Sequence, residues 1–215
     1  VAWPKGKIGG QGGRAFAIPC QANNSALAVN QLWAAGVEVS RAQTPWKSGG
    51  TDFPPGTFIV PVSKAADAVI EKAAGDLYLS VQRVEVPSNL KLAKLEKPRL
   101  GLYQSWEAEI DEGWTELVLK NHGFSFSLLH DAEMKAGELK DHFEVIILPS
   151  QSPDAIVNGH AKGTRPPEYV GGLTQTGVEN LGLFVKEGGT LVALGSACDL
   201  AIDRFELPVR NVIKG

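Results

Sequence analysis

The fold is decided by residues 188–200, which read GGTLVALGSACDL. A pair of glycines precedes an apolar run at residues 190–194. The run ends at a turn of small residues, and a segment with apolar residues at helical spacing follows. A buried parallel strand passes into a helix in this way, and the ligand-binding or catalytic groups of open α/β sheets gather at that edge. The stretch therefore predicts an α/β fold, and it makes Cys198, at the start of the expected helix, a candidate nucleophile.

The second half of the chain alternates strands with helices. Helices are expected from Asp111 to Gly123 and over the segment that carries Val178 and Phe184 at helical spacing. This order predicts a parallel, flavodoxin-like sheet with right-handed crossovers, and its two most apolar strands should be parallel neighbours in the sheet centre. The expected strands are residues 99–103, 124–129, 144–149 and 190–194, of which 144–148 and 190–194 are the most apolar.

The first half predicts a smaller α/β layer. Helices are expected to begin at the N-caps Ser25 and Ser63, and to stop at Gly36 and Gly75. Between them, residues 44–56 contain prolines and glycines and should form a loop. The order βαββαβ fits a ferredoxin-like or Rossmann-related domain. Its strands are expected at residues 15–19, 37–42, 57–62 and 79–86.

Three segments follow from these patterns: a linker or tail at residues 1–14, a small α/β domain at 15–97 and a second α/β domain at 98–215. Residues 87–98 are rich in lysine and should connect the domains. The glycines of the first segment precede a strand, whereas a dinucleotide-binding loop follows one. Because the chain opens at Val1 without a methionine, we expect it to be a piece of a longer protein.

Composition narrows the class of protein. The chain has 215 residues, of which 43% are hydrophobic and 21% charged, as is ordinary for a globular protein. The net charge is −3, so the chain has no excess of positive charge to attract nucleic acid, which is therefore not expected as a partner. No apolar run approaches the roughly 20 residues of a membrane span. The two cysteines, Cys20 and Cys198, do not have metal-ligand spacing.

Six motifs lie at residues 100–107, 111–114, 147–152, 166–173, 188–200 and 207–212. Together they resemble the C-terminal region of large bacterial proteins of the carboxypeptidase A-like zinc peptidase type. In that family the zinc peptidase domain lies upstream, and the matching region resembles a class I glutamine amidotransferase-like domain. The resemblance implies an amidotransferase-like domain at residues 98–215 and an extracellular or periplasmic location. It also implies packing on the upstream peptidase region of the same chain, which would hold the zinc.

No cofactor or metal is expected in this fragment. A zinc peptidase site needs a His-x-x-Glu pair and a later histidine. Only His130 has a glutamate, Glu133, three residues later. The downstream histidines, His142 and His160, lack the flanking pattern of such a peptidase. A polar connection between a strand and a helix explains His130 and Glu133 better.

The nucleophile of a glutamine amidotransferase lies in a Gly-x-Cys-x-Gly elbow and needs a histidine partner from late in the domain. Here Gly195 matches the first glycine, but Ala197 occupies the nucleophile position and Cys198 comes one residue late. No histidine follows in the sequence. A packed free thiol is therefore expected. The competing hypothesis is a hydrolase or amidotransferase that acts through Cys198 or Ser196, with His160 as the candidate partner.

A ligand-binding crevice is expected where the parallel strands end. A tryptophan face combined with hydroxyl, amide and carboxylate groups would suit a small molecule, a peptide or a sugar. The alternative is that Ser152 begins a turn and Trp106 is half-buried packing. Acidic residues near 107–112 are favourable beside a helix N-terminus without any function. The candidate ligand-binding residues are Ser105, Trp106, Glu107, Gln151, Ser152 and Ser196.

Residues 158–172 are expected to form a long loop, which is usually functional or disordered in a compact domain. The loop could dock on the upstream peptidase region or act as a lid over the crevice. Together these observations favour a non-catalytic accessory region of an exported zinc carboxypeptidase-like protein, which binds a ligand or packs on the rest of the chain.

Overall fold

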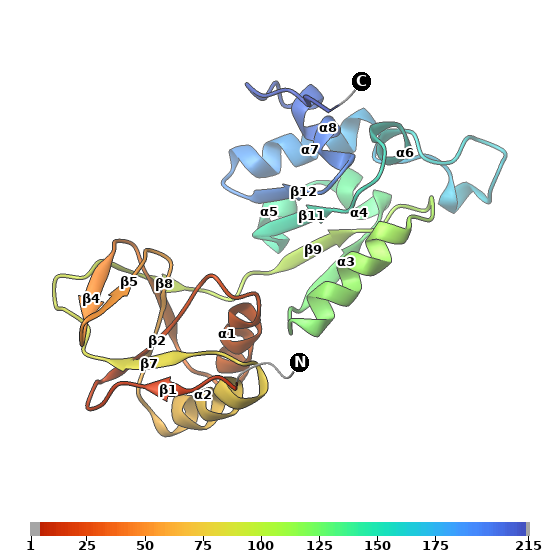
Figure 1. The fold of residues 1–215 in the computed structure, drawn as a ribbon. Helices are drawn as coiled ribbons and strands as arrows, with labels where there is room; N and C mark the ends of the chain where they lie inside the picture. Colours follow the sequence, from red (N-terminus) through yellow and green to blue (C-terminus); the bar gives the residue numbers. More distant parts are fainter. Residues whose placement is uncertain (1–4, 214–215) are drawn as a thin grey trace. The chain divides into compact units, whose positions relative to one another are not determined.

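The computed structural model describes residues 5–213 and divides into two compact units. The first runs to Lys97 and also includes Asn121–Phe124, and the second comprises Pro98–Lys120 together with the chain from Ser125 onward. Each unit combines one main sheet with helices (Figure 1), which confirms the predicted α/β class.

The first unit contains a six-stranded sheet in the order β1-β7-β2-β6-β3-β8. Its neighbouring strands are antiparallel except for the parallel pair of β1 with β7. The strands joined by α1, β2 and β3, have β6 between them, and those joined by α2, β6 and β7, have β2 between them. This is a split βαβ arrangement of the ferredoxin-like kind rather than the parallel layer of a Rossmann-related domain. The elements are β1 (Ile8–Gly9), β2 (Ala15–Ile18), α1 (Asn24–Ala34), β3 (Val39–Ala42), β6 (Phe58–Pro61), α2 (Lys64–Asp76), β7 (Val81–Val84) and β8 (Leu92–Leu95).

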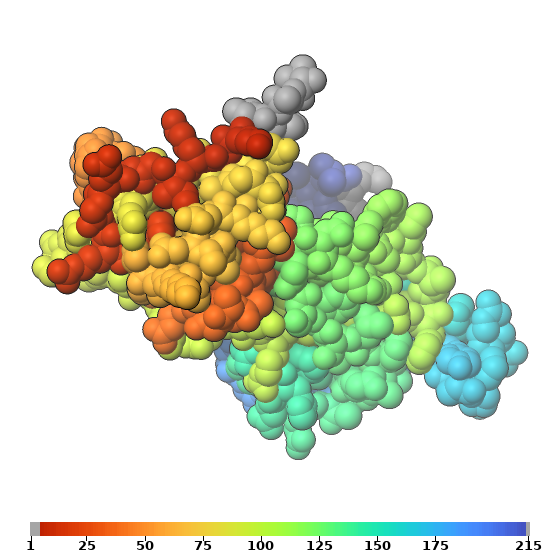
Figure 2. Space-filling view, turned by 90° about the horizontal axis from the view of Figure 1, so that it is seen from below, coloured from red at the N-terminus to blue at the C-terminus, as the bar shows by residue number. Residues whose placement is uncertain are grey.

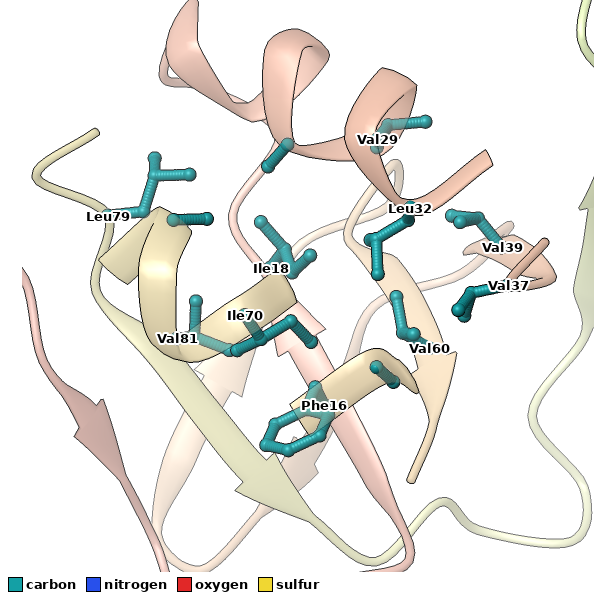
Figure 3. Close-up of a cluster of buried hydrophobic side chains, with 13 residues drawn as sticks. Phe16, Ile18, Val29, Leu32, Val37, Val39, Val60, Ile70, Leu79 and Val81 are labelled. Atoms are coloured by element: carbon teal, nitrogen blue, oxygen red, sulfur yellow. The ribbon is translucent and has the colours of Figure 1, made fainter. Parts of the chain in front are cut away.

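The core of the first unit explains why β2 is apolar throughout. Phe16 and Ile18 point toward the helices, where they pack with Leu32 of α1 and Ile70 of α2 (Figure 3). The intervening alanines of β2 belong to a second buried cluster, together with Trp46 and other residues. Successive side chains of a strand alternate between its faces, so a strand covered on both faces is buried throughout.

The expected loop at residues 44–56 contains a hairpin instead. Strands β4 (Trp46–Ser48) and β5 (Thr51–Phe53) pair antiparallel, and the rings of Trp46 and Phe53 stack with centroids 4.5 Å apart. Gly49 and Gly50 form the turn with φ of +54° and +79°, angles that favour glycine in a two-residue hairpin loop. The strands are too short to show a periodic pattern in the sequence.

Four other expectations for the first unit are wrong. The lysine-rich connector contains β8, and the linker at residues 1–14 contains β1; residues 1–4 lie outside the described range. Both are edge strands, which are short or charged and so lack a clear apolar signal. Ser25 does not cap a helix: it lies inside α1, and its hydroxyl donates to the Pro19 carbonyl at 2.5 Å. Ser63 does cap α2, as predicted, but the helix continues past Gly75.

The second unit has a four-stranded, fully parallel sheet in the order β10-β9-β11-β12. Counted along the chain this order is 2-1-3-4, the beginning of the doubly wound order 2-1-3-4-5. A fifth strand is absent from the described residues of this sheet, so the flavodoxin-like assignment stays a prediction. The elements are β9 (Leu100–Tyr103), α3 (Ile110–Asn121), β10 (Phe126–Leu129), α4 (Asp131–Ala136), α5 (Leu139–His142), β11 (Val145–Leu148), α6 (Pro153–Val157), α7 (Thr174–Lys186), β12 (Thr190–Ala193) and α8 (Ala197–Arg204).

The two most apolar strands of this sheet are parallel neighbours, as predicted, with Ile146 of β11 opposite Leu191 of β12. The central position expected for β12 is wrong, because β12 lies at the edge of the sheet. Its residues are apolar since α7 and α8 pack against it. The residues of β12 are only partly buried or exposed, so a continuous apolar run says nothing about how many strands flank a strand.

Replacement of Ile146 by aspartate should unfold the second unit. Ile146 is fully buried in β11, between β9 and β12, and an unpaired buried carboxylate costs several kcal/mol, a large part of the stability of a typical domain. Ile213→Asp is the matched control, because Ile213 is 90% exposed. Urea unfolding followed by circular dichroism compares the variants. A folded Ile146→Asp variant with native stability would contradict the assigned core.

The cap of α2 gives a second test. The Ser63 hydroxyl accepts a hydrogen bond from the Ala66 amide at 3.1 Å, so Ser63→Ala should lower the free energy of unfolding by about 1 kcal/mol. Ser63→Asp keeps an acceptor and should retain most of the stability. Chemical denaturation of the three proteins measures both effects, and equal losses in the two variants would refute a capping role.

Candidate functional site

The carboxyl ends of β9, β10 and β11 meet at one edge of the second sheet, because all three strands are parallel neighbours. The loop after β9 carries Gln104–Glu107, and His130 follows β10 directly. The loop after β11 carries Ser150–Ser152. Open α/β sheets bind ligands at this edge.

Gln151 ties two of these loops together. Its side chain is buried, and its Nε2 donates to Ser105 Oγ at 2.9 Å and to the Glu107 carbonyl at 3.2 Å. Ser105 Oγ in turn donates to the same carbonyl at 2.7 Å. The structure thus brings together Ser105, Glu107 and Gln151, three of the residues expected in the crevice.

A pocket of about 270 Å³ opens beside this bridge. Four of the expected residues line it, including Trp106. The sequence did not single out the pocket residues Tyr103, Gln104 and Pro149, and it explained Glu109 and Glu112 by the helix dipole alone. The lining residues are Tyr103, Gln104, Ser105, Trp106, Glu107, Ala108, Glu109, Glu112, Pro149 and Gln151.

Trp106 is held in an aromatic cluster. Its ring stacks on His130 with centroids 4.1 Å apart, and it meets Tyr169 edge-on at 4.8 Å. His130 Nδ1 lies 2.8 Å from the Gln104 carbonyl, and His160 Nε2 lies 3.2 Å from the Trp106 carbonyl. Neither His130 nor Tyr169 was among the expected crevice residues. His130 directly follows a strand, so the principle that ligands bind at the carboxyl ends of parallel strands could have found it.

Two expected residues do not line the pocket. Ser152 caps α6, since its Oγ accepts from the Ala155 amide at 3.2 Å, which matches the alternative of a serine that begins a turn. Ser196 is exposed at the start of α8, and its amide donates to Ser150 Oγ at 3.3 Å. Gly195 must be glycine here: its φ is +49°, and a Cβ would lie 2.3 Å from Ser150 Oγ.

The candidate nucleophile Cys198 is half-buried, and its thiol donates to the Ala193 carbonyl at 3.2 Å. Ala197, at the elbow position, is fully buried. Within residues 5–213, Cys198 makes no hydrogen bond to a histidine, and His160 is bonded to Trp106 instead. The thiol is thus bonded to the backbone of β12 at the start of α8.

A buried pair lies next to the pocket. The Tyr103 hydroxyl donates to Asp131 Oδ1 at 2.7 Å, and both residues are almost fully buried. Asp131 Oδ2 is buried and has no hydrogen-bond partner among the described residues. Burial raises the pKa of the Asp131 carboxyl, while the Tyr103 hydroxyl opposes that shift. Burial, followed by the bond to Asp131, also raises the pKa of Tyr103.

The long loop after β11 is partly structured. It contains α6 and a 3-10 turn, η1 (Pro167–Tyr169), and an isolated antiparallel bridge joins His160 to Gly171. The rest extends away from the sheet and stands out on the surface of the second unit (Figures 1 and 2). Because Tyr169 and His160 both contact Trp106, the loop is anchored at the pocket.

The described residues show three further features. In residues 5–213, no three histidine, cysteine, aspartate or glutamate side chains are grouped so that they could hold a metal ion. None of the helices described has the length and apolar character needed to cross a membrane. A larger groove of about 770 Å³, lined mostly by apolar side chains of α7, β12 and α8, lies beside the edge strand.

The pair of Tyr103 and Asp131 predicts a pH-dependent stability. Because the folded-state pKa of Asp131 is raised, its contribution to stability is greatest at acid pH and is lost as the pH rises through that pKa. Asp131→Asn keeps an acceptor for Tyr103 and cannot ionise. The free energy of unfolding of the variant minus that of the native chain should therefore be higher at pH 7 than at pH 4.

Urea unfolding at the two pH values measures this difference. Asp203→Asn, which replaces an exposed carboxylate, is the control and should change the free energy of unfolding by less than about 0.5 kcal/mol at either pH. A relative stability of the Asp131→Asn variant that does not change with pH would show that burial does not penalise the Asp131 carboxylate.

Comparison of the chain with protein-family models, with curated proteins and with solved structures finds no match.

Proposed function

We propose that the second unit is a non-catalytic ligand-binding module, an accessory region of an exported zinc carboxypeptidase-like protein. The observation that carries the proposal is a contrast between two places at the carboxyl ends of the strands of this sheet. Beside β9 and β11 lies a pocket with an aromatic ring, carboxylates and a buried amide. Beside β12, the elbow position is filled by the buried side chain of Ala197.

The binding side of the proposal is supported by the preorganised loops. Gln151 holds the loop after β9 through two hydrogen bonds, and the aromatic cluster holds Trp106. Groups that are fixed before a ligand arrives lose little conformational entropy on binding, which favours affinity. The ligand would be a small molecule, a peptide or a sugar that fits a small pocket.

The hydrogen bond of the Cys198 thiol supports the proposal that the module is non-catalytic. A cysteine nucleophile requires a thiolate and a histidine partner, and Cys198 donates to a backbone carbonyl instead. Ser196, the other candidate of the hydrolase alternative, is exposed and has no side-chain cap bond. The link to an exported zinc peptidase depends on the sequence motifs alone. The sequence of the complete gene product would test it through the presence of an upstream zinc-binding motif.

Alkylation of Cys198 separates the two functions. In a Cys20→Ser background, iodoacetamide should modify Cys198 more slowly in the folded protein near neutral pH than in urea, because the thiol is half-buried and bonded to Ala193. Mass spectrometry gives both rates. The Cys198→Ser variant reports the reactivity of Cys20 as the control.

A folded protein in which Cys198 reacts faster than in the unfolded chain would indicate an activated thiolate. That outcome would favour the hydrolase alternative over an accessory module.

A further inference from the structure

Helix α3 carries an apolar stripe on its exposed side. Ile110, Trp114 and Leu117 are 73%, 58% and 44% exposed, and their spacing of i, i+4 and i+7 places them on one face of the helix. All the residues of α3 are described, and none of them is buried. Exposed apolar side chains that form a contiguous patch, with a tryptophan among them, are typical of a protein interface.

The opposite face of α3 is less exposed, and it is polar. Glu112, Thr115, Glu116 and Leu119 lie on that face, and each is only partly exposed. A surface helix normally turns its apolar face toward the core and its polar face toward water, and α3 does the reverse. Its apolar stripe is therefore not used in the packing of the second unit.

We infer that α3 joins two copies of the chain, with the apolar stripes of the two helices packed antiparallel about a two-fold axis. In such a dimer the same patch is used on both copies, so the patch must be complementary to itself. The inference goes beyond the proposed ligand-binding function and does not depend on it.

The stripe is complementary to itself in shape. In an antiparallel pair centred between Thr115 and Glu116, Trp114 of one copy lies level with Leu117 of the other. Gly113 lies on the same flank of the helix as Leu117, and each residue advances the helix by about 1.5 Å. Leu117 of the second copy is then one residue away from the level of Gly113 and packs over its bare backbone.

The packing of the chain itself gives no reason for a glycine at position 113. Glycine weakens a helix relative to alanine. Apart from the chain neighbours of Gly113 and the backbone of its own helix, no heavy atom of the described residues lies within 4 Å of the place where a Cβ would stand. A side chain would therefore fit in a single copy. The close approach of a second helix supplies the missing reason for the glycine.

The charges beside the stripe are also complementary. Glu109 and Lys120 are eleven residues apart, which is about three turns, so they lie on the same flank near opposite ends of α3. Antiparallel packing brings Lys120 of each copy within one turn of Glu109 of the other. Parallel packing would instead place Glu109 beside Asp111 of the second copy, where like charges repel.

A membrane surface is a poorer occupant for the stripe. A helix that lies in the plane of a membrane carries lysine and arginine on its polar face, where they attract anionic lipids. The charged residues of α3 are Asp111, Glu112, Glu116 and Lys120. Three of these four are acidic and would repel such lipids.

Sedimentation equilibrium of the full chain tests the inference. Two short helices bury less than the roughly 1,200–2,000 Å² of a standard interface, so we expect a reversible dimer with a micromolar dissociation constant. Trp114→Ser should raise that constant at least about tenfold. Leu183→Ser is the control, because Leu183 is a 50% exposed residue of α7, outside the stripe, and it should leave the constant unchanged.

Gly113→Ala separates an interface from a purely local role. Alanine favours the helix, so the variant should have a higher midpoint of urea unfolding at low protein concentration. Its added methyl group holds the two helices apart, so the dissociation constant should rise at least about tenfold. A dimer that is equally tight in the Gly113→Ala or the Trp114→Ser variant would overturn the inference, and so would a chain that stays monomeric at about 0.5 mM.

A charge exchange tests the antiparallel arrangement. Lys120→Glu should weaken the dimer, and Glu109→Lys in the same chain should restore it, because the pair is then re-formed between the copies with its charges reversed. Lys186→Glu, on α7, is the control and should have no effect. A double variant as weak as Lys120→Glu alone would overturn the antiparallel arrangement.

Discussion

The parallel pairing of β11 with β9 on one side and β12 on the other is the constraint on which the second unit depends. Since all strands run in one direction, their carboxyl ends and the loops that follow them meet at a single edge. Ser105 and Gln151, 46 residues apart in the sequence, become hydrogen-bond partners for this reason. The same edge holds the turn at Gly195, whose lack of a side chain allows the close approach of Ser150.

At the carboxyl ends of these strands, hydrogen-bond donors and carboxylate oxygens differ in whether they have partners. Donors of Gln151, Ser105 and Tyr103 hold the loops and the core together, while carboxylate oxygens are left without partners. Unsatisfied buried oxygens lower the stability of a domain, so their presence needs an explanation. Among the described residues, Glu112 Oε1 and Asp131 Oδ2 are oxygens of this kind. In the stretch around Cys198, the thiol donates a hydrogen bond to the Ala193 carbonyl of β12.

Long apolar segments of the chain could be predicted from the sequence, and short ones could not. The α/β class, the parallel neighbours β11 and β12 and the cap at Ser63 followed from periodicity and turn chemistry. Edge strands such as β8 were missed because their pattern is short and charged, and the edge position of β12 was hidden by the helices that cover it. In the site, the principle that ligand-binding residues follow parallel strands predicted Gln151 correctly. It does not distinguish Gln151 from Ser152, which caps α6 instead. The unpaired state of Glu112 has no sequence signal, because it depends on what surrounds one oxygen atom.

The central claim is that the pocket between the loops after β9 and β11 is the binding site of the second unit. Chemical-shift mapping tests it most directly, with the ¹⁵N-labelled chain titrated in turn with a dipeptide, a monosaccharide and a small amine. The account predicts perturbed amides in Ser105–Glu109 and at Gln151, with smaller effects elsewhere. Perturbations confined to the groove of α7 and α8, or to the first unit, would contradict it.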